Sequence, residues 1–160
     1  MVLKRKIYQK MLNWKRDNKG TSALLINGAR RVGKSYICRQ FGKNEYKSMI
    51  FIDFTDVSSE IVDIFENETS NLDLFFLKLA AYHGVILYER ASVFIFDEIQ
   101  QFPKARQLIK HLIADGRYDY IETGSLITLK QNVENIVIPS EEETIDMFPL
   151  DFEEFLWALR

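Results

Sequence analysis

The stretch Gly28-Ala29-Arg30-Arg31-Val32-Gly33-Lys34-Ser35 decides the fold of this chain. It matches the pattern G-x-x-x-x-G-K-[ST], in which the glycines let the backbone wrap closely around phosphate oxygens. Successive backbone N–H groups and the start of the following helix then point at the bound anion. The pattern therefore predicts a phosphate-binding loop for a nucleoside triphosphate.

The residues on either side of the loop fit this interpretation. The apolar run 23–27 predicts a buried strand before the loop, and the segment 35–41 predicts the first turns of a helix after it. Lys34 supplies a positive charge for the β- and γ-phosphates, and the Ser35 hydroxyl can ligate Mg²⁺. We expect the nucleotide to contact the loop and the residue after it: Gly28, Ala29, Arg30, Arg31, Val32, Gly33, Lys34, Ser35 and Tyr36.

A second signal lies downstream, where the hydrophobic run 91–96 ends in Asp97 and Glu98. Such a run is typical of a strand that is buried on both faces of a parallel sheet. Carboxylates at the C-terminal end of this strand lie at the edge where α/β folds bind ligands. We expect Asp97 to hold Mg²⁺ opposite Ser35, and Glu98 to orient and polarise the water that attacks the γ-phosphate. Without the loop, two acids capping a surface strand would be the better interpretation; with it, the pair predicts an ATPase.

Predicted helices and strands alternate along the chain. The apolar spacing predicts a helix over residues 1–16, a short helix near 61–65, and a helix that begins at Pro103 and ends at Asp115-Gly116. Ser70 and Asp73 resemble the capping box of a further helix. Strands are predicted over 22–28, 48–54, 92–97, 118–122 and 143–147. Strands separated by helices mean an α/β fold with a mostly parallel, doubly wound sheet, in one domain spanning 1–160.

Composition narrows the class of protein. The 160 residues are 47% hydrophobic with a net charge of −2, and no apolar run approaches the length of a membrane span. The single cysteine, Cys38, rules out an internal disulfide framework and is expected to be buried. We therefore predict a cytoplasmic protein without a membrane partner. His83 and His111 lack metal-ligand spacing. The basic first 20 residues are interpreted as a solvated helix face, with DNA contact as the weaker alternative.

The chain resembles the N-terminal ATPase domain of the bacterial and archaeal AAA-type predicted ATPases, in which that domain precedes a C-terminal region with a nuclease-like fold. Four stretches carry the resemblance. They are residues 5–8 with Trp14, the loop GARRVGKS, the strand VFIFDEIQ at 93–100, and TGSL at 123–126 followed by FPLDFEEFLWA at 148–158.

The resemblance implies a P-loop ATPase of the AAA type, with a five-stranded sheet in the order 5-1-4-3-2 and helices on both faces. It places Thr123 or Ser125 where a polar side chain reads the γ-phosphate, and it leaves the two unresolved. It also implies that a lid or linker begins near 150–160 and that the lid and C-terminal domain lie outside this chain. The sequence leaves open whether the protein forms homo-oligomers.

An arginine finger has no clear candidate. Many relatives carry a basic residue shortly before the last strand, whereas residues 138–143 contain none. Arg30, Arg31 and Arg117 remain, and nothing in the sequence assigns them this role. We expect Arg30 and Arg31 to frame the mouth of the loop and to form local salt bridges.

Together these features predict an ATP-binding domain that hydrolyses ATP with Mg²⁺ to ADP and phosphate, weakly in isolation. The alternative is a nucleotide-dependent switch or interaction module that binds ATP without turnover. Glu98 favours hydrolysis, because a pure binder needs no water-orienting carboxylate. A third interpretation, an ATP-driven machine associated with DNA, rests on the resemblance alone.

Overall fold

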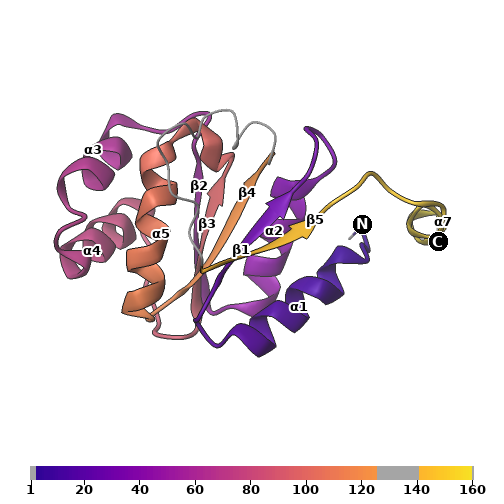
Figure 1. The fold of residues 1–160 in the computed structure, drawn as a ribbon, viewed down its shortest axis with the longest axis horizontal. Helices are drawn as coiled ribbons and strands as arrows, with labels where there is room; N and C mark the ends of the chain where they lie inside the picture. Colours follow the sequence, from indigo (N-terminus) through magenta and orange to yellow (C-terminus); the bar gives the residue numbers. More distant parts are fainter. Residues whose placement is uncertain (1–2, 126–140, 160) are drawn as a thin grey trace.

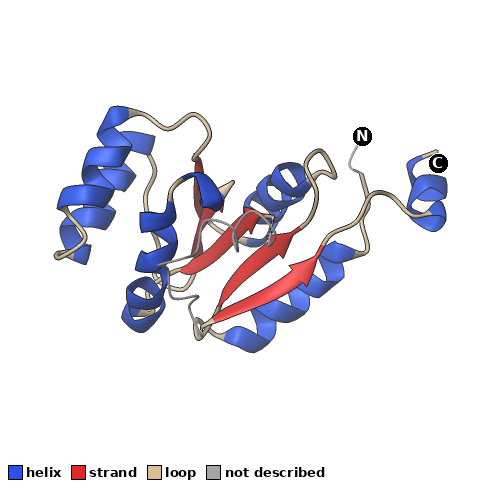
Figure 2. Cartoon of the chain, turned by 45° about the horizontal axis from the view of Figure 1, so that its top comes forward, coloured by secondary structure: helices blue, strands red, loops and turns tan. Residues whose placement is uncertain are grey.

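Five parallel strands form one sheet in the order β2-β3-β4-β1-β5 (Figure 1). The structure, a computed structural model, describes residues 3–125 and 141–159. The strands are β1 (Ala23–Asn27), β2 (Ser48–Asp53), β3 (Ser92–Asp97), β4 (Asp119–Gly124) and β5 (Glu142–Asp146). Read from the other edge, this is the order 5-1-4-3-2, so the expected α/β fold and its strand order are confirmed. All the C-terminal ends of the strands therefore meet at one edge, which Figure 2 shows as arrowheads on the same side.

Helices α1 (Ile7–Asn18) and α2 (Lys34–Glu45) cover one face of the sheet. Their apolar side chains pack on alternate residues of the central strands, as the two-residue period of a strand requires. This core contains Met11, Trp14, Ile37 and Phe41 from the helices and Leu24, Ile26, Val93, Ile95 and Ile121 from the strands. Because α2 begins directly after loop 28–33, this packing fixes the loop against the end of β1.

Helices α3 (Ser59–Asn67), α4 (Leu72–His83) and α5 (Pro103–Asp115) cover the opposite face. The core there is rich in aromatic rings, including Phe54, Phe65, Phe75, Phe94 and Phe96. A short 3-10 helix, η1 (Ile99–Gln101), joins β3 to α5, and α7 (Phe152–Ala158) follows β5. None of the described helices is both long and apolar enough to cross a membrane.

Several element boundaries differ from the sequence-based expectation. Helix α1 begins at Ile7 rather than at residue 1, because the backbone N–H of Lys6 donates to the Glu154 carboxylate of α7 instead of to a helical turn. Helix α4 is capped by Asn71, whose side chain accepts from the N–H of Leu74 at 3.2 Å, so the capping box at Ser70 is wrong. Strand β4 runs two residues further than expected, to Gly124.

A buried ionic group links α5 to the edge strand β5. Arg106 Nη2 lies 2.8 Å from Glu142 Oε1, and the two side chains are 2% and 3% exposed. Glu122 of β4 is buried on the same face, and burial together with the Glu142 carboxylate raises its pKa well above the ordinary value, whereas Arg106 opposes the rise. Burial therefore favours the neutral form of the Glu122 carboxyl group.

Candidate functional site

The loop 28–33 lies at the C-terminal edge of the sheet, between β1 and α2. Two positive φ values shape it, 66° at Arg31 and 99° at Gly33, and the second is a conformation that glycine adopts without strain. A Cβ atom at Gly28 would lie 2.5 Å from the backbone oxygen of Met147, so glycine is needed there for close approach. Both glycines were expected from the sequence to let the backbone turn tightly, and the geometry at Gly28 and Gly33 agrees with this expectation.

Lys34 is the first residue of α2 and is buried, with 5% of its surface exposed. Its ammonium donates to the carbonyl oxygens of Gly28 and Ala29 at 2.8 and 2.7 Å. The lysine charge therefore lies against the loop backbone, where it would exchange carbonyl oxygens for the oxygens of a bound phosphate.

Ser35, Asp97 and Thr123 form one hydrogen-bonded group on three different elements. The Ser35 hydroxyl of α2 donates to both Asp97 carboxylate oxygens at 2.8 Å. The Thr123 hydroxyl of β4 donates to Asp97 Oδ1 at 2.6 Å. Residues that are distant in sequence thus meet at the end of β3, as the carboxyl edge of a parallel sheet requires.

Burial raises the pKa of Asp97 above the ordinary aspartate value, and the nearby Glu98 and Asp53 carboxylates act in the same direction. The hydrogen bonds from Thr123 and Ser35 oppose this rise because they favour the charged form. The carboxylate is therefore held at a site where a further positive charge would be favourable.

Glu98 has a left-handed backbone conformation, with φ 54° and ψ 51°. A residue with a Cβ atom adopts this conformation at a cost of about 1–2 kcal/mol. Its backbone N–H donates to the Thr123 hydroxyl at 2.9 Å, and its carboxylate accepts from the Gln100 side chain. Thr123 therefore contacts both acidic residues, one through the side chain and one through the backbone.

Asp53 and Gln100 are polar residues that sequence reasoning did not assign to the site. Asp53 ends β2 and lies directly opposite Asp97 in the sheet register. The signal was present, since the apolar run before Asp53 resembles the one before Asp97. Gln100 could not be found from its pattern, because a single turn after β3 brings its side chain back to Glu98.

An open pocket of about 640 Å³ lies beside the loop. Loop residues 29–33 form one wall, and Leu3, Arg5, Tyr36, Pro149 and Leu150 form the rest. Tyr36 is 39% exposed and faces this space, so the segments before α1 and after β5 complete a cavity whose volume is typical of small-molecule sites.

The remaining arginines and Ser125 are placed as follows. Arg30 and Arg31 are exposed, and within the described part of the chain they form no ion pair, so the expected local salt bridges are absent. Arg117 precedes β4, at the opposite end of the sheet from the loop, and pairs with Asp115 and Asp73. Ser125 is half-buried next to Gly124, whose carbonyl accepts from the N–H of Gly28.

The Ser35–Asp97 group fits a magnesium ion. Its oxygen atoms are the hard ligands that Mg²⁺ prefers, and the ion ordinarily takes one or two carboxylates together with phosphate oxygens and water. The 2.8 Å bonds from the Ser35 hydroxyl to Asp97 show that the two side chains converge on one point. Among the described residues, no group of three or more His, Cys, Asp or Glu side chains is placed to hold a metal ion.

The other sequence-based expectations concern cysteine and histidine. Cys38 is buried as expected in the core beneath α2, and burial raises the pKa of its thiol. His83 Nδ1 lies 2.9 Å from the carbonyl oxygen of Leu79 one turn earlier, which is ordinary helix packing.

Comparison with known proteins gives a family and a fold. A family model described as an AAA domain matches residues 20–156. A solved chain in the structure of Drosophila ORC bound to AT-rich DNA and Cdc6 has a TM-score of 0.52 and 14% sequence identity, covering 93% of this chain and 56% of that one. At this identity the likeness concerns the fold alone.

A second solved chain, from the structure of C. elegans PCH-2, has a TM-score of 0.44 and 15% identity, covering 91% of this chain and 39% of that one. No curated protein matches the sequence. The chain thus spans little more than half the length of the first solved structure it resembles.

Proposed function

Because the chain belongs to the AAA domain family, we propose that it binds Mg·ATP at loop 28–35 and hydrolyses it to ADP and phosphate. The observation that carries the proposal is the hydrogen-bonded group of Ser35, Asp97 and Thr123 beside the buried ammonium of Lys34. Backbone N–H groups and a lysine suffice for a loop to hold an anion, whereas the converging hydroxyls and the Asp97 carboxylate add a position for a metal ion.

The ground-state contacts of this proposal come from the loop. Backbone N–H groups at the start of α2 bind the phosphates, helped by the positive end of the helix dipole. Lys34 exchanges the carbonyls of Gly28 and Ala29 for the β- and γ-phosphate oxygens. Ser35 and Asp97 would hold Mg²⁺, which neutralises negative charge on the phosphates when it is bound.

Glu98 is the residue we assign to water activation. It is adjacent to the metal ligand Asp97, and its carboxylate is held by Gln100. A water that donates to this carboxylate would be oriented for attack on the γ-phosphate. We propose that Thr123 positions Glu98 by accepting a hydrogen bond from its backbone N–H. We propose Ser125 as the residue that contacts the γ-phosphate directly.

The pocket beside the loop is the proposed site of the nucleoside. Its volume of about 640 Å³ and its position next to residues 29–33 suit a base and sugar attached to phosphates in the loop. Tyr36 offers an aromatic ring there, and Arg30 and Arg31 supply positive charge at its mouth.

Phosphate release and ATP affinity, measured on the same sample with and without Mg²⁺, test the proposal. Mg²⁺-dependent binding and turnover that both fall in an Asp97→Asn variant support it. Unchanged Mg²⁺-dependent binding and turnover in Asp97→Asn would contradict it. Asp56→Asn, at an exposed aspartate in the segment after β2, is the matched control for the loss of one negative charge.

The second candidate function is a switch that binds ATP with little turnover. The position of Arg117 favours it, because this arginine lies at the opposite end of the sheet from the loop and pairs with Asp115 and Asp73. Where measured in other phosphate-transfer enzymes, an arginine finger is worth about 10³–10⁵ in rate. We therefore propose that this chain alone turns over ATP slowly.

Several finer features belong to the same proposal. Helix α7 is the proposed start of a lid, supported by its position after β5 and by its exposed apolar residues. A nuclease-like region after the lid, homo-oligomerisation and DNA association are supported only by the resemblance and by the basic residues near α1. A cytoplasmic location is supported by the single, buried Cys38.

A further inference from the structure

Arg5 joins three segments of the chain through one buried guanidinium group. Its Nη1 donates to the carbonyl of Val32 in the phosphate-binding loop at 3.0 Å, and its Nη2 donates to the carbonyl of Phe148 at 2.6 Å. Its Nε donates to Glu154 of α7 at 3.2 Å. The residue is only 8% exposed, so these bonds replace the water that its charge would otherwise bind.

The far end of this connection determines where α7 begins. Glu154 Oε1 accepts from Arg5 and from the backbone N–H of Lys6, and its Oε2 accepts from the backbone N–H of Asp151 in a capping box. Of the residues in Phe152–Ala158, Glu154 alone is buried, while Phe152 is 77% exposed. The helix is thus held at its first turn by a polar contact rather than by an apolar core.

The other end of this connection lies in the loop itself, at the Val32 carbonyl. Val32 stands between Arg31 and Gly33, the two residues with positive φ. The segment after β5 packs on the loop as well, since the Met147 N–H donates to the Asn27 carbonyl at 2.7 Å and its oxygen faces Gly28. A shift of the loop backbone would therefore be felt directly by Arg5 and by the segment that leads to α7.

We infer that Arg5 is a positioning residue that couples occupancy of the phosphate-binding loop to the placement of α7. The inference rests on the proposed nucleotide binding and adds a mechanical consequence to it. When phosphate draws Lys34 from the carbonyls of Gly28 and Ala29, the loop backbone relaxes and the Val32 carbonyl shifts. The planar guanidinium presents its donors in a fixed fork, so it transmits this shift to Glu154.

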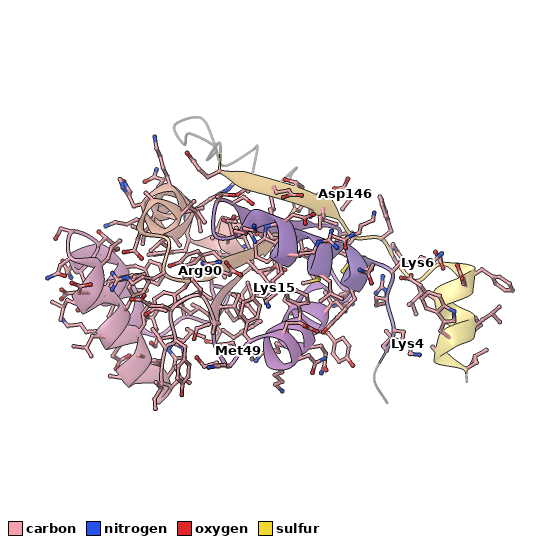
Figure 3. All side chains as sticks on the ribbon, turned by 90° about the horizontal axis from the view of Figure 1, so that it is seen from below. Lys4, Lys6, Lys15, Met49, Arg90 and Asp146 are labelled. Carbon is pink, nitrogen blue, oxygen red and sulfur yellow. The ribbon has the colours of Figure 1, made fainter. Side chains whose placement is uncertain are left out.

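Trp157 is a reporter already present on α7. It lines a pocket of about 410 Å³ together with Leu3, Arg5 and Tyr8, so its ring lies between the moving helix and the start of α1. Figure 3 shows Lys4 and Lys6 beside α7, and Lys6 Nζ lies 6.0 Å from the centre of the Trp157 ring. Its emission is isolated by subtracting the signal of a Trp157→Phe variant, in which Trp14, the other tryptophan of the sequence, remains buried on α1.

The experiment titrates the whole chain with Mg·ATP and follows both heat of binding and Trp157 emission. We expect the wild type to show an emission change that saturates with binding. Arg5→Gln should lose most of this change, while its ATP affinity falls by only about tenfold, the size of one charge-assisted hydrogen bond. Arg5→Lys, which keeps the charge but not the fork, is the second variant and should also lose most of the change.

Lys6→Gln is the matched control. Lys6 contacts α7 through exposed ion pairs with Asp151 and Glu153 but has no contact with the loop, so its variant should keep the nucleotide-dependent change. An Arg5→Gln chain with a full emission change would overturn the inference, as would a wild type that binds ATP without any Trp157 response. A wild type that binds no ATP would instead remove the proposed function itself.

Discussion

Replacing Thr123 by valine removes one hydroxyl from the centre of the site while keeping the shape of the side chain. That hydroxyl is fully buried, donates to Asp97 Oδ1 at 2.6 Å and accepts from the Glu98 N–H at 2.9 Å. Valine leaves the Glu98 N–H without this acceptor, and an unsatisfied buried donor costs about 1–3 kcal/mol. We expect the free energy of unfolding to fall by about 2 kcal/mol.

The effect on turnover should be larger than the effect on binding. Glu98 holds a left-handed backbone conformation that its N–H bond to Thr123 helps to fix, so the variant frees Glu98 to leave it. A misplaced general base loses about 10²–10⁴ in rate. Loss of the Thr123 donor also raises the pKa of Asp97 further, so Mg²⁺ competes with protons at a higher pH than in the wild type.

Chemical denaturation, calorimetric ATP titration and phosphate release measure the three effects separately. Thr123→Ser keeps the hydroxyl and is the matched control, and Ser125→Ala tests the neighbouring candidate. The reasoning is refuted if Thr123→Val has wild-type stability and turnover, or if Thr123→Ser is equally damaged.

Three further predictions concern other residues. Glu98→Gln should keep ATP affinity within a few-fold while hydrolysis falls by about 10²; wild-type phosphate release would show that Glu98 does not orient water. Gly28→Ala should lower stability by about 1–3 kcal/mol, because its Cβ would lie 2.5 Å from the Met147 oxygen, and thermal unfolding measures this. Glu122 has a raised pKa in the folded state, so its contribution to stability is fully present at low pH and is lost as pH rises from the ordinary glutamate value toward the raised one. Glu122→Gln should therefore be more stable than the wild type at neutral pH, with a difference that shrinks toward pH 4 in denaturation curves; a constant difference would contradict this.

The strands and the central residues could be predicted because local patterns carry them, whereas the strand order is expected from the family resemblance alone. The glycines of the loop, the apolar run before Asp97 and the Thr-Gly-Ser turn each identify a strand end, and parallel strands bring their ends to one edge. The contacts among Ser35, Asp97 and Thr123 follow from that topology. Their roles in catalysis remain predictions.

Other features depend on contacts between distant segments, which no local pattern reveals. The run of basic residues 4–6 predicts the solvated face of a helix. In the structure Arg5 instead contacts both loop 28–33 and α7, and the backbone N–H of Lys6 contacts α7. The buried ion pair between Arg106 and Glu142, which lie 36 residues apart, could not be predicted either, because a single charged residue in a sequence is ordinarily expected at the surface. Arg117 was considered as an arginine finger only because it is an arginine. It precedes β4, so it lies at the opposite end of the sheet from loop 28–33 of the same chain.

The central claim is that Lys34 and its loop bind the phosphates of ATP. Calorimetric titration of Mg·ATP into the wild type, Lys34→Ala and the control Lys43→Ala tests it most directly, because Lys43 is an exposed lysine on the same helix. We predict that Lys34→Ala loses about 2–3 kcal/mol of binding free energy, tenfold to several hundredfold in affinity, while Lys43→Ala binds like the wild type. A folded Lys34→Ala protein with unchanged ATP affinity would contradict the account.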